Sequence, residues 1–358
     1  MKQWWDKFFH GAGYPRPIIK CDDALDAMYL ARKKFLFEQF GEFSIGEEHP
    51  VMDGRYVSLV LKYGMDLIPY LFGAKLTCQE AGGFMPEEFT YEQLIKMEPV
   101  DLENHPLRRW ILDEKERKLA RYGVTSCFLD YESPTNIAVR LRGVEFYSDM
   151  IEDPDFARHV LSISLESIKN VVNFARANFP LSEYDIIYDY FIGNCNVIMI
   201  SPNMYTEIVR PFDIALANYC YDLSDNTNLM LHHCDVNADS FLDAYAKIPG
   251  VKRFQASHLT DTSAYAAGMP GVDFYAMLSP NELNKLEIET LTQIFDRAIS
   301  QGARELDLWN IDVLTPPEKL RAIFNGITNI CKTRSVNVRF DVLPFVWDEI
   351  EWAYPVYQ

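Results

Sequence analysis

The sequence predicts an α/β protein, a (β/α)8 TIM barrel with a helical extension at its N-terminus. Short β-rich runs alternate with longer amphipathic segments, and about eight such runs occur along the chain. No Gly-rich phosphate loop follows any of them, which disfavours the alternative of an open doubly wound sheet. We expect residues 1–60 to form a helical cap packed on the barrel, and residues 61–358 to form the catalytic barrel as one structural unit.

Segments rich in β-branched and aromatic residues supply the expected strands. Ser201-Pro202, Asp153-Pro154 and the capping-box pattern from Thr315 to Glu318 mark helix starts between them. The expected strands are Asp66–Gly73, Thr125–Tyr131, Asp185–Phe191, Leu229–Cys234, Arg253–His258, Asp273–Leu278, Glu305–Ile311 and Val336–Leu343.

The charge of the chain argues against two classes of partner. The net charge is −18, and no basic stripe offers a surface for nucleic acid or for an anionic membrane. The N-terminus lacks the pattern of a signal peptide, and the apolar runs are too short to span a bilayer. The seven cysteines include no CxxC pair, so no disulfide framework is implied. We therefore expect a cytoplasmic protein that binds neither nucleic acid nor membranes.

The expected fourth strand ends in an unusual tripeptide, His232-His233-Cys234. Function in a parallel barrel lies at the carboxyl ends of the strands, so this tripeptide is a candidate site. Because alternate strand residues point to the same side, His232 and Cys234 would project together and His233 would face away. An imidazole and a thiolate are ligand types that zinc binds. The alternative is a buried histidine beside a structural cysteine.

Other expected strand ends are also polar, and their convergence on one rim suggests a site. We expect three of these residues to orient the substrate or transfer protons, namely Asp130, Tyr131 and Asp189. We expect others to bind the substrate, namely Glu132, Ser133, His258, Met277, Trp309 and Asn310.

A series of short motifs occurs in a fixed order between about Tyr56 and Ile327. The motifs are the expected opening strand Tyr63–Pro69 (YGMDLIP), the segment Ser133-Pro134-Thr135 running to Gly143, the expected helix Tyr147–Leu161, the pieces Ile200–Tyr205 (ISPNMY) and Val209-Arg210-Pro211, the segment Leu231–Asp235 (LHHCD) and Thr315–Glu318 (TPPE). In order and spacing, this set resembles the uroporphyrinogen decarboxylase superfamily, on its corrinoid methyltransferase branch.

The resemblance implies a zinc-dependent methyltransferase. Such enzymes use an HxC pair and a distal cysteine as zinc ligands, and the pair corresponds to His232 and Cys234. The distal cysteine is absent before Thr315, where Asp312 or Asp307 could supply an oxygen ligand instead. Asp235 also stands where the family has a glycine. We take His232, Cys234 and Asp312 as the expected zinc ligands.

The resemblance also implies a partner and a cofactor. A methyl group would move between a small-molecule thiol or methyl ether and the cobalamin of a separate corrinoid protein. A homodimer is a further expectation of the same kind. The arginine-rich N-terminal motif of true decarboxylases is missing, which disfavours uroporphyrinogen as the substrate. Two alternatives stay open: a metal-free lyase acting on a small carboxylic acid, and a non-catalytic binding barrel.

Overall fold

A computed structural model describes residues 56–58, 66–78, 84–123, 125–128, 131–179, 191–223, 229–233, 237–278, 280–303, 305–308 and 317–336. Within these ranges the protein is a mixed α/β structure, and its largest sheet has five strands that are all parallel. The predicted α/β class is confirmed for this part of the chain. None of the described helices combines the length and the apolar character that crossing a bilayer requires.

The strands in the described ranges are β1 Tyr56–Ser58, β2 Leu76–Cys78, β3 Phe84–Pro86, β4 Ser126–Phe128, β5 Phe191–Gly193, β6 Leu229–His233, β7 Val251–Ser257, β8 Asp273–Leu278 and β9 Glu305–Leu308. The parallel sheet follows the order of the chain, β5-β6-β7-β8-β9. Barrels and singly wound open sheets share this order, whereas doubly wound sheets reverse it. A second parallel pair joins β1 to β4, and an antiparallel pair joins β2 to β3.

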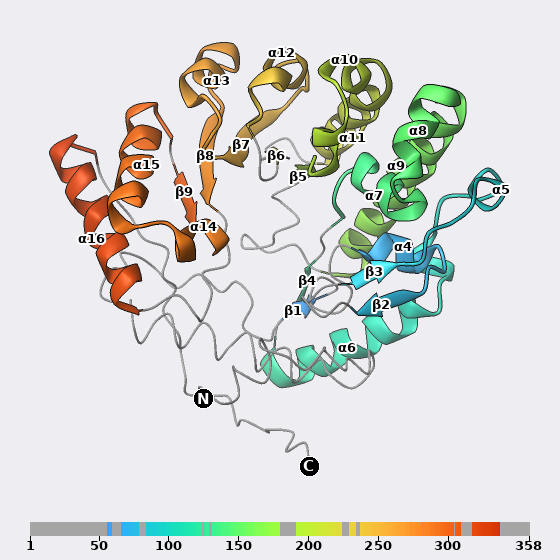
Figure 1. The fold of residues 1–358 in the computed structure, drawn as a ribbon. Coiled ribbons are helices and arrows are strands. Elements are labelled where there is room, and N and C mark those ends of the chain that lie inside the picture. Colours follow the sequence, from blue (N-terminus) through green and yellow to red (C-terminus); the bar gives the residue numbers. More distant parts are fainter. Residues whose placement is uncertain are drawn as a thin grey trace.

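Helices connect the strands and cover them from one side. Figure 1 shows that α16, α15, α13, α12, α11, α9 and α6 follow one another in an arc outside the strands. The helices are α4 Leu67–Leu71, α5 Tyr91–Leu94, η3 Leu102–Asn104, α6 Leu107–Tyr122, α7 Pro134–Arg142, α8 Glu145–Glu152, α9 Pro154–Asn178, η5 Asn196–Met199, α10 Pro202–Met204, the π-helix η6 Tyr205–Val209, α11 Arg210–Leu223, η7 Asp239–Phe241, α12 Leu242–Tyr245, α13 Thr262–Gly268, α14 Pro280–Lys285, α15 Ile288–Ser300 and α16 Pro317–Thr333.

Two of the predicted helix starts are confirmed by their cap geometry. The side chain of Asp153 accepts a hydrogen bond from Phe156 N at 3.1 Å, and Pro154 occupies the first position of α9. The side chain of Ser201 caps α10 by accepting from Met204 N at 3.2 Å. Both caps satisfy main-chain donors that a helix leaves open at its start. The third predicted start lies partly outside the described residues, and α16 begins at Pro317.

The predicted first strand, Asp66–Gly73, is wrong, because this segment forms the helix α4. A short apolar run does not by itself distinguish a buried strand from a buried helix. The buried side chains of Leu67, Ile68 and Leu71 have helical spacing, and Pro69 lies within the first turn, where helices tolerate proline. The strand that pairs with β4 lies upstream, at Tyr56–Ser58, so the end of the predicted helical cap at residues 1–60 is also a strand.

Most of the other predicted strands are observed as strands where the structure describes them. Strand β8 has the predicted bounds, and β6 and β7 lie within two residues of theirs. Strands β4 and β9 begin within one residue of the predicted starts but end three residues before the predicted ends. Of the predicted third strand only Phe191 is described, and it begins β5. Residues 1–55 and 337–343 lie outside the described residues, and Val336 is not in a strand.

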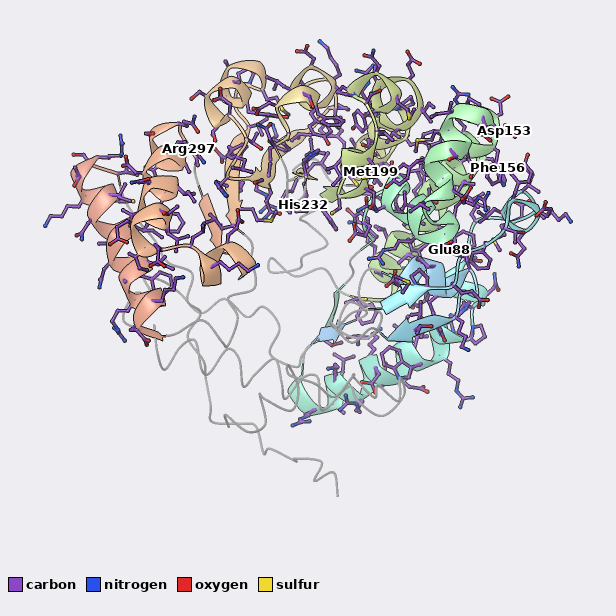
Figure 2. The ribbon with its side chains drawn as sticks, viewed as in Figure 1. Glu88, Asp153, Phe156, Met199, His232 and Arg297 are labelled. Atoms are coloured by element: carbon purple, nitrogen blue, oxygen red, sulfur yellow. The ribbon has the colours of Figure 1, made fainter. Side chains whose placement is uncertain are left out.

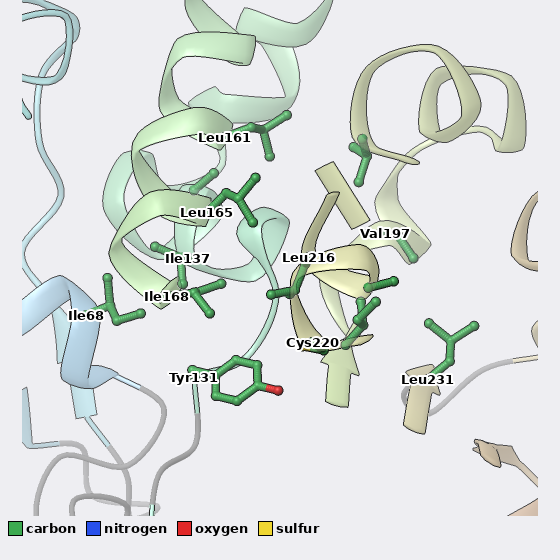
Figure 3. Close-up of a cluster of buried hydrophobic side chains, with 14 of the residues drawn as sticks. Ile68, Tyr131, Ile137, Leu161, Leu165, Ile168, Val197, Leu216, Cys220 and Leu231 are labelled. Carbon is green, nitrogen blue, oxygen red and sulfur yellow. The ribbon is translucent and has the colours of Figure 1, made fainter. Parts of the chain in front are cut away.

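A large apolar core lies between the helices and the strands. Figure 3 shows Ile68 of α4, Ile137 of α7 and Ile168 of α9 in one cluster of buried side chains. The same core extends through α11 to Leu231 of β6. A second cluster joins β8 to α14, α15 and α16. The core therefore fixes the helices against the strands from which the candidate site projects.

Truncation of Ile168 should strongly lower the stability of the fold, because this side chain is fully buried on α9. Ile168→Ala should lower the free energy of unfolding by about 2–5 kcal/mol, because it removes buried methyl groups and leaves a cavity. Ile151→Ala on α8 is the matched control, since that side chain is 68% exposed. The control should change stability by less than about 0.5 kcal/mol in urea unfolding. Equal effects of the two variants would contradict this placement of the core.

Candidate functional site

The carboxyl ends of β5, β6 and β7 lie side by side, because the three strands are parallel. In their register Gly193 pairs with His232, and His232 pairs with Gln255. The ladder continues one residue beyond β5, where Asn194 N donates to His232 O at 2.8 Å. Main-chain bonds therefore hold the His232 backbone from both neighbouring strands.

The His232 side chain is buried and has a defined tautomer. Its Nδ1 lies 2.7 Å from Oε1 of Gln255, and an amide oxygen only accepts hydrogen bonds. Nδ1 therefore carries a proton, so the ring presents its lone pair on Nε2 when it is neutral. Proteins orient metal-binding histidines by a hydrogen bond of this kind from the other ring nitrogen. Figure 2 shows His232 in the strand layer, inside the arc of helices.

The neighbouring His233 faces the helices instead. Its Nδ1 lies 2.7 Å from the hydroxyl of Tyr245 on α12, and its ring packs against Phe241 and Tyr245. The prediction that His232 and His233 point to opposite sides is confirmed. Burial, together with the nearby His232, lowers the pKa of His233 from its ordinary value of 6.5 to about 4. His233 is therefore a neutral core residue at physiological pH.

The end of β7 carries a network built on His258. Nε2 of His258 lies 2.8 Å from Oε1 of Glu282 on α14, and Nη2 of Arg297 on α15 lies 3.1 Å from Nδ1. Because the guanidinium donates to Nδ1, the ring proton is on Nε2 and points to the carboxylate. His258 N also donates to the carbonyl of the buried Met277 on β8 at 3.0 Å. The network ties α14 and α15 to the end of β7, and Figure 2 shows Arg297 in the helical layer.

The segment after β4 lies against β5. The hydroxyl of Tyr131 accepts from Phe191 N at 2.8 Å, and the two rings pack together. Ser133 is fully buried, and its hydroxyl caps α7 by accepting from Asn136 N at 3.2 Å. Tyr131 and Ser133 therefore hold these elements in place through their hydroxyls. Their predicted roles toward a substrate stay predictions.

Glu132 occupies the most unusual backbone position in this segment. Its φ is +59°, in the left-handed region that few residues other than glycine adopt. Its carboxylate is buried and accepts a hydrogen bond from Nδ2 of Asn136, whose Oδ1 accepts from Asn196 N at 3.0 Å. A Cβ at Gly193 would come within 2.9 Å of Oε2 of Glu132. The absence of a side chain at Gly193 thus admits the carboxylate to the end of β5.

Six of the predicted site residues lie outside the described residues: Asp130, Asp189, Cys234, Trp309, Asn310 and Asp312. Among the residues that the structure describes, no group of three or more His, Cys, Asp or Glu side chains could hold a metal ion. Of the expected zinc ligands only His232 is therefore placed. The prediction of a zinc site stays a prediction.

Several residues that contribute to the site geometry were not predicted from the sequence. Gln255 lies between the buried apolar residues Phe254 and Ala256 of β7, and a polar residue at such a position is a usable signal. Asn194 follows β5 directly, but the expected third strand ended earlier, at Phe191. Glu282 and Arg297 lie on helices and carry no such signal in the sequence.

The sequence was compared with models of protein families and with curated proteins. No model of a protein family matches this sequence, and a search among curated proteins finds no match.

The depressed pKa of His233 predicts a loss of stability in mild acid. The unfolded chain takes up the proton first, so the stabilising contribution is complete above about pH 6.5 and is lost as the pH falls toward about 4. The loss should reach up to about 3 kcal/mol. His233→Gln should remove this contribution. The measurement is the difference in unfolding free energy between the variant and the wild type, recorded as a function of pH. A difference that does not change with pH would contradict the burial of a neutral His233.

Proposed function

We propose that this protein is a corrinoid-dependent methyltransferase on a closed (β/α)8 barrel. It would move a methyl group between a small molecule, either a thiol or a methyl ether, and the cobalamin of a partner corrinoid protein. The observation that carries the proposal is His232, which begins an HxC pair at the carboxyl end of a parallel strand and has its lone pair on Nε2.

The arrangement of the strands supports a barrel. Strands β5 to β9 follow one another in sequence order, and β1 pairs in parallel with β4. This is the order that successive βα units give when they wind in one direction around a barrel. The helices outside the strands in Figure 1 have the place that the outer helical layer of a barrel occupies.

Zinc fits the ligand types of the three expected residues. Imidazole nitrogen, thiolate sulfur and carboxylate oxygen are its usual ligands, which His232, Cys234 and Asp312 would supply. When bound, zinc would lower the pKa of an acceptor thiol or polarise the oxygen of a methyl ether. The chain's own contribution at this point is the Gln255 side chain, which holds the His232 ring in one tautomer and orientation.

Neighbouring strand ends would position the substrate. The buried Glu132 carboxylate and the His258 network lie at the ends of β4 and β7, and both are held by further hydrogen bonds. Groups fixed in this way orient a bound molecule without having to be ordered first. Asp130, Tyr131 and Asp189 would orient the reacting group or move its proton, and Ser133, Met277, Trp309 and Asn310 would contact the substrate.

Metal analysis tests the ligand assignment. We expect the purified protein to bind zinc in stoichiometric amount, and His232→Ala and Cys234→Ala to lower zinc affinity by about 10-fold or more, because each removes a direct ligand. His105→Ala, which changes a partly buried histidine before α6, is the matched control and should retain the metal. Unchanged metal content in both ligand variants would exclude this site.

A methyl-transfer assay tests the reaction class. With methylcobalamin and a small thiol, we expect loss of the methyl–cobalt absorbance together with formation of the thioether. With cob(I)alamin and a methyl ether, we expect the reverse change at cobalt. His232→Ala should abolish methyl transfer in whichever direction the wild type catalyses, and His105→Ala should not. Release of CO₂ from a small carboxylic acid without any corrinoid would indicate the lyase, and a ligand-induced rise in Tm without turnover would indicate a binding protein.

A further inference from the structure

A second cluster of polar side chains lies behind the end of β5. We call Asn194, Tyr205 and Asp213 the buried acid cluster. Asn194 follows β5, Tyr205 begins the π-helix η6 and Asp213 lies in the first turn of α11. All three side chains are fully buried. Oδ2 of Asp213 accepts from the Tyr205 hydroxyl at 2.6 Å and from Nδ2 of Asn194 at 2.8 Å.

The charge of Asp213 has no counter-charge in this cluster. In the described part of the chain no salt bridge includes Asp213, and its two hydrogen-bond donors are neutral. A buried carboxylate without a cation is strongly disfavoured, and such groups instead take up a proton. The charge balance alone therefore favours a neutral acid at this position.

The hydrogen-bond balance points the same way. Among the described residues, no group donates to Oδ1 of Asp213 or to Oδ1 of Asn194, and both atoms are buried. Both atoms are acceptors when the aspartate is ionised, so neither can satisfy the other. A proton on Asp213 Oδ1 changes this, because the acid can then donate to the Asn194 amide oxygen. The two groups are already joined through Nδ2 and Oδ2 at 2.8 Å.

We propose that Asp213 is a proton-binding site, and that its protonated form shares the proton with Oδ1 of Asn194 in a paired amide–acid arrangement. The bond from Asn194 Nδ2 to Asp213 Oδ2 and the new bond from Asp213 Oδ1 to Asn194 Oδ1 would then satisfy both side chains. No other ligand is needed for this site.

The electrostatic surroundings place the titration near neutral pH. Burial raises the pKa of Asp213 from its ordinary value of 3.8 to about 6, although the hydrogen bonds from Tyr205 and Asn194 oppose the shift. The titratable group that faces the cluster from α12 is Tyr245, and burial raises its pKa well above the ordinary value. Tyr205 and Tyr245 therefore stay neutral while Asp213 titrates.

The proton site is connected to the proposed ligand strand by the main chain of Asn194. Its N–H donates to His232 O, while its side chain is anchored on Asp213. Protonation of Asp213 would therefore add a hydrogen bond to Asn194, the residue after β5 whose N–H holds the His232 carbonyl. The existence of the proton site does not depend on the proposed function, because it involves neither metal nor substrate.

Infrared spectroscopy and unfolding of the substrate-free protein test the proposal. We expect a protonated carboxyl C=O band at about pH 5 that disappears as the pH rises through about 6, and that Asp213→Asn removes. Because the folded protein binds the extra proton, the Asp213 contribution to stability falls as the pH rises from about 4 to about 6. Asp213→Asn should abolish this fall and match or exceed the wild type at pH 7, since its amide can donate to Asn194 Oδ1.

Two further variants keep the test decisive. Tyr205→Phe removes a donor to the ionised form and should move the loss of the band to higher pH. Asp153→Asn is the matched control, because Asp153 also accepts from a tyrosine hydroxyl, that of Tyr91 at 3.0 Å, but is partly exposed. It should keep the band and the wild-type slope. Two results would overturn the proposal: a carboxyl band that Asp213→Asn does not remove, or an Asp213→Asn variant that keeps the wild-type pH slope and is less stable at pH 7. Either would indicate an ionised Asp213 that is hydrogen-bonded to internal water.

Discussion

The parallel register of β5, β6 and β7 is the constraint on which the candidate site depends. It pairs Gly193 with His232 and His232 with Gln255, so three strand ends meet at one edge. The pairing brings the amide of Gln255 to the His232 ring and the main-chain N–H of Asn194 to the His232 carbonyl. A shift of one residue in this register would turn each of these side chains to the opposite face of the sheet. The position and tautomer of His232 thus follow from the sheet itself.

The two faces of β6 serve different purposes because strand residues alternate. His232 faces Gln255 on the strand layer, while His233 is enclosed by Phe241 and Tyr245 and stays neutral. The buried acid cluster lies behind β5 and reaches the same strand end through Asn194. The end of β6 is therefore supported from the neighbouring strands and from the helical layer at once.

Much of the fold could be predicted from the sequence, because apolar strand segments such as Asp273–Leu278 are separated along the chain by turns and helices. The error at Asp66–Gly73 arose because a short apolar run has no periodicity that separates a strand from a helix. The opposite orientation of His232 and His233 was predictable from alternation alone. The partners Glu282 and Arg297 were not, because their contacts with His258 depend on how α14 and α15 pack against β7.

The most direct measurement of the central claim is a crystal structure of the zinc-treated protein with anomalous scattering recorded at the zinc edge. We predict one strong peak at the end of β6 within bonding distance of Nε2 of His232, with Cys234 as a second ligand and Nδ1 of His232 still bonded to Gln255. A zinc-free His232, or a peak that His232 does not contact, would contradict it.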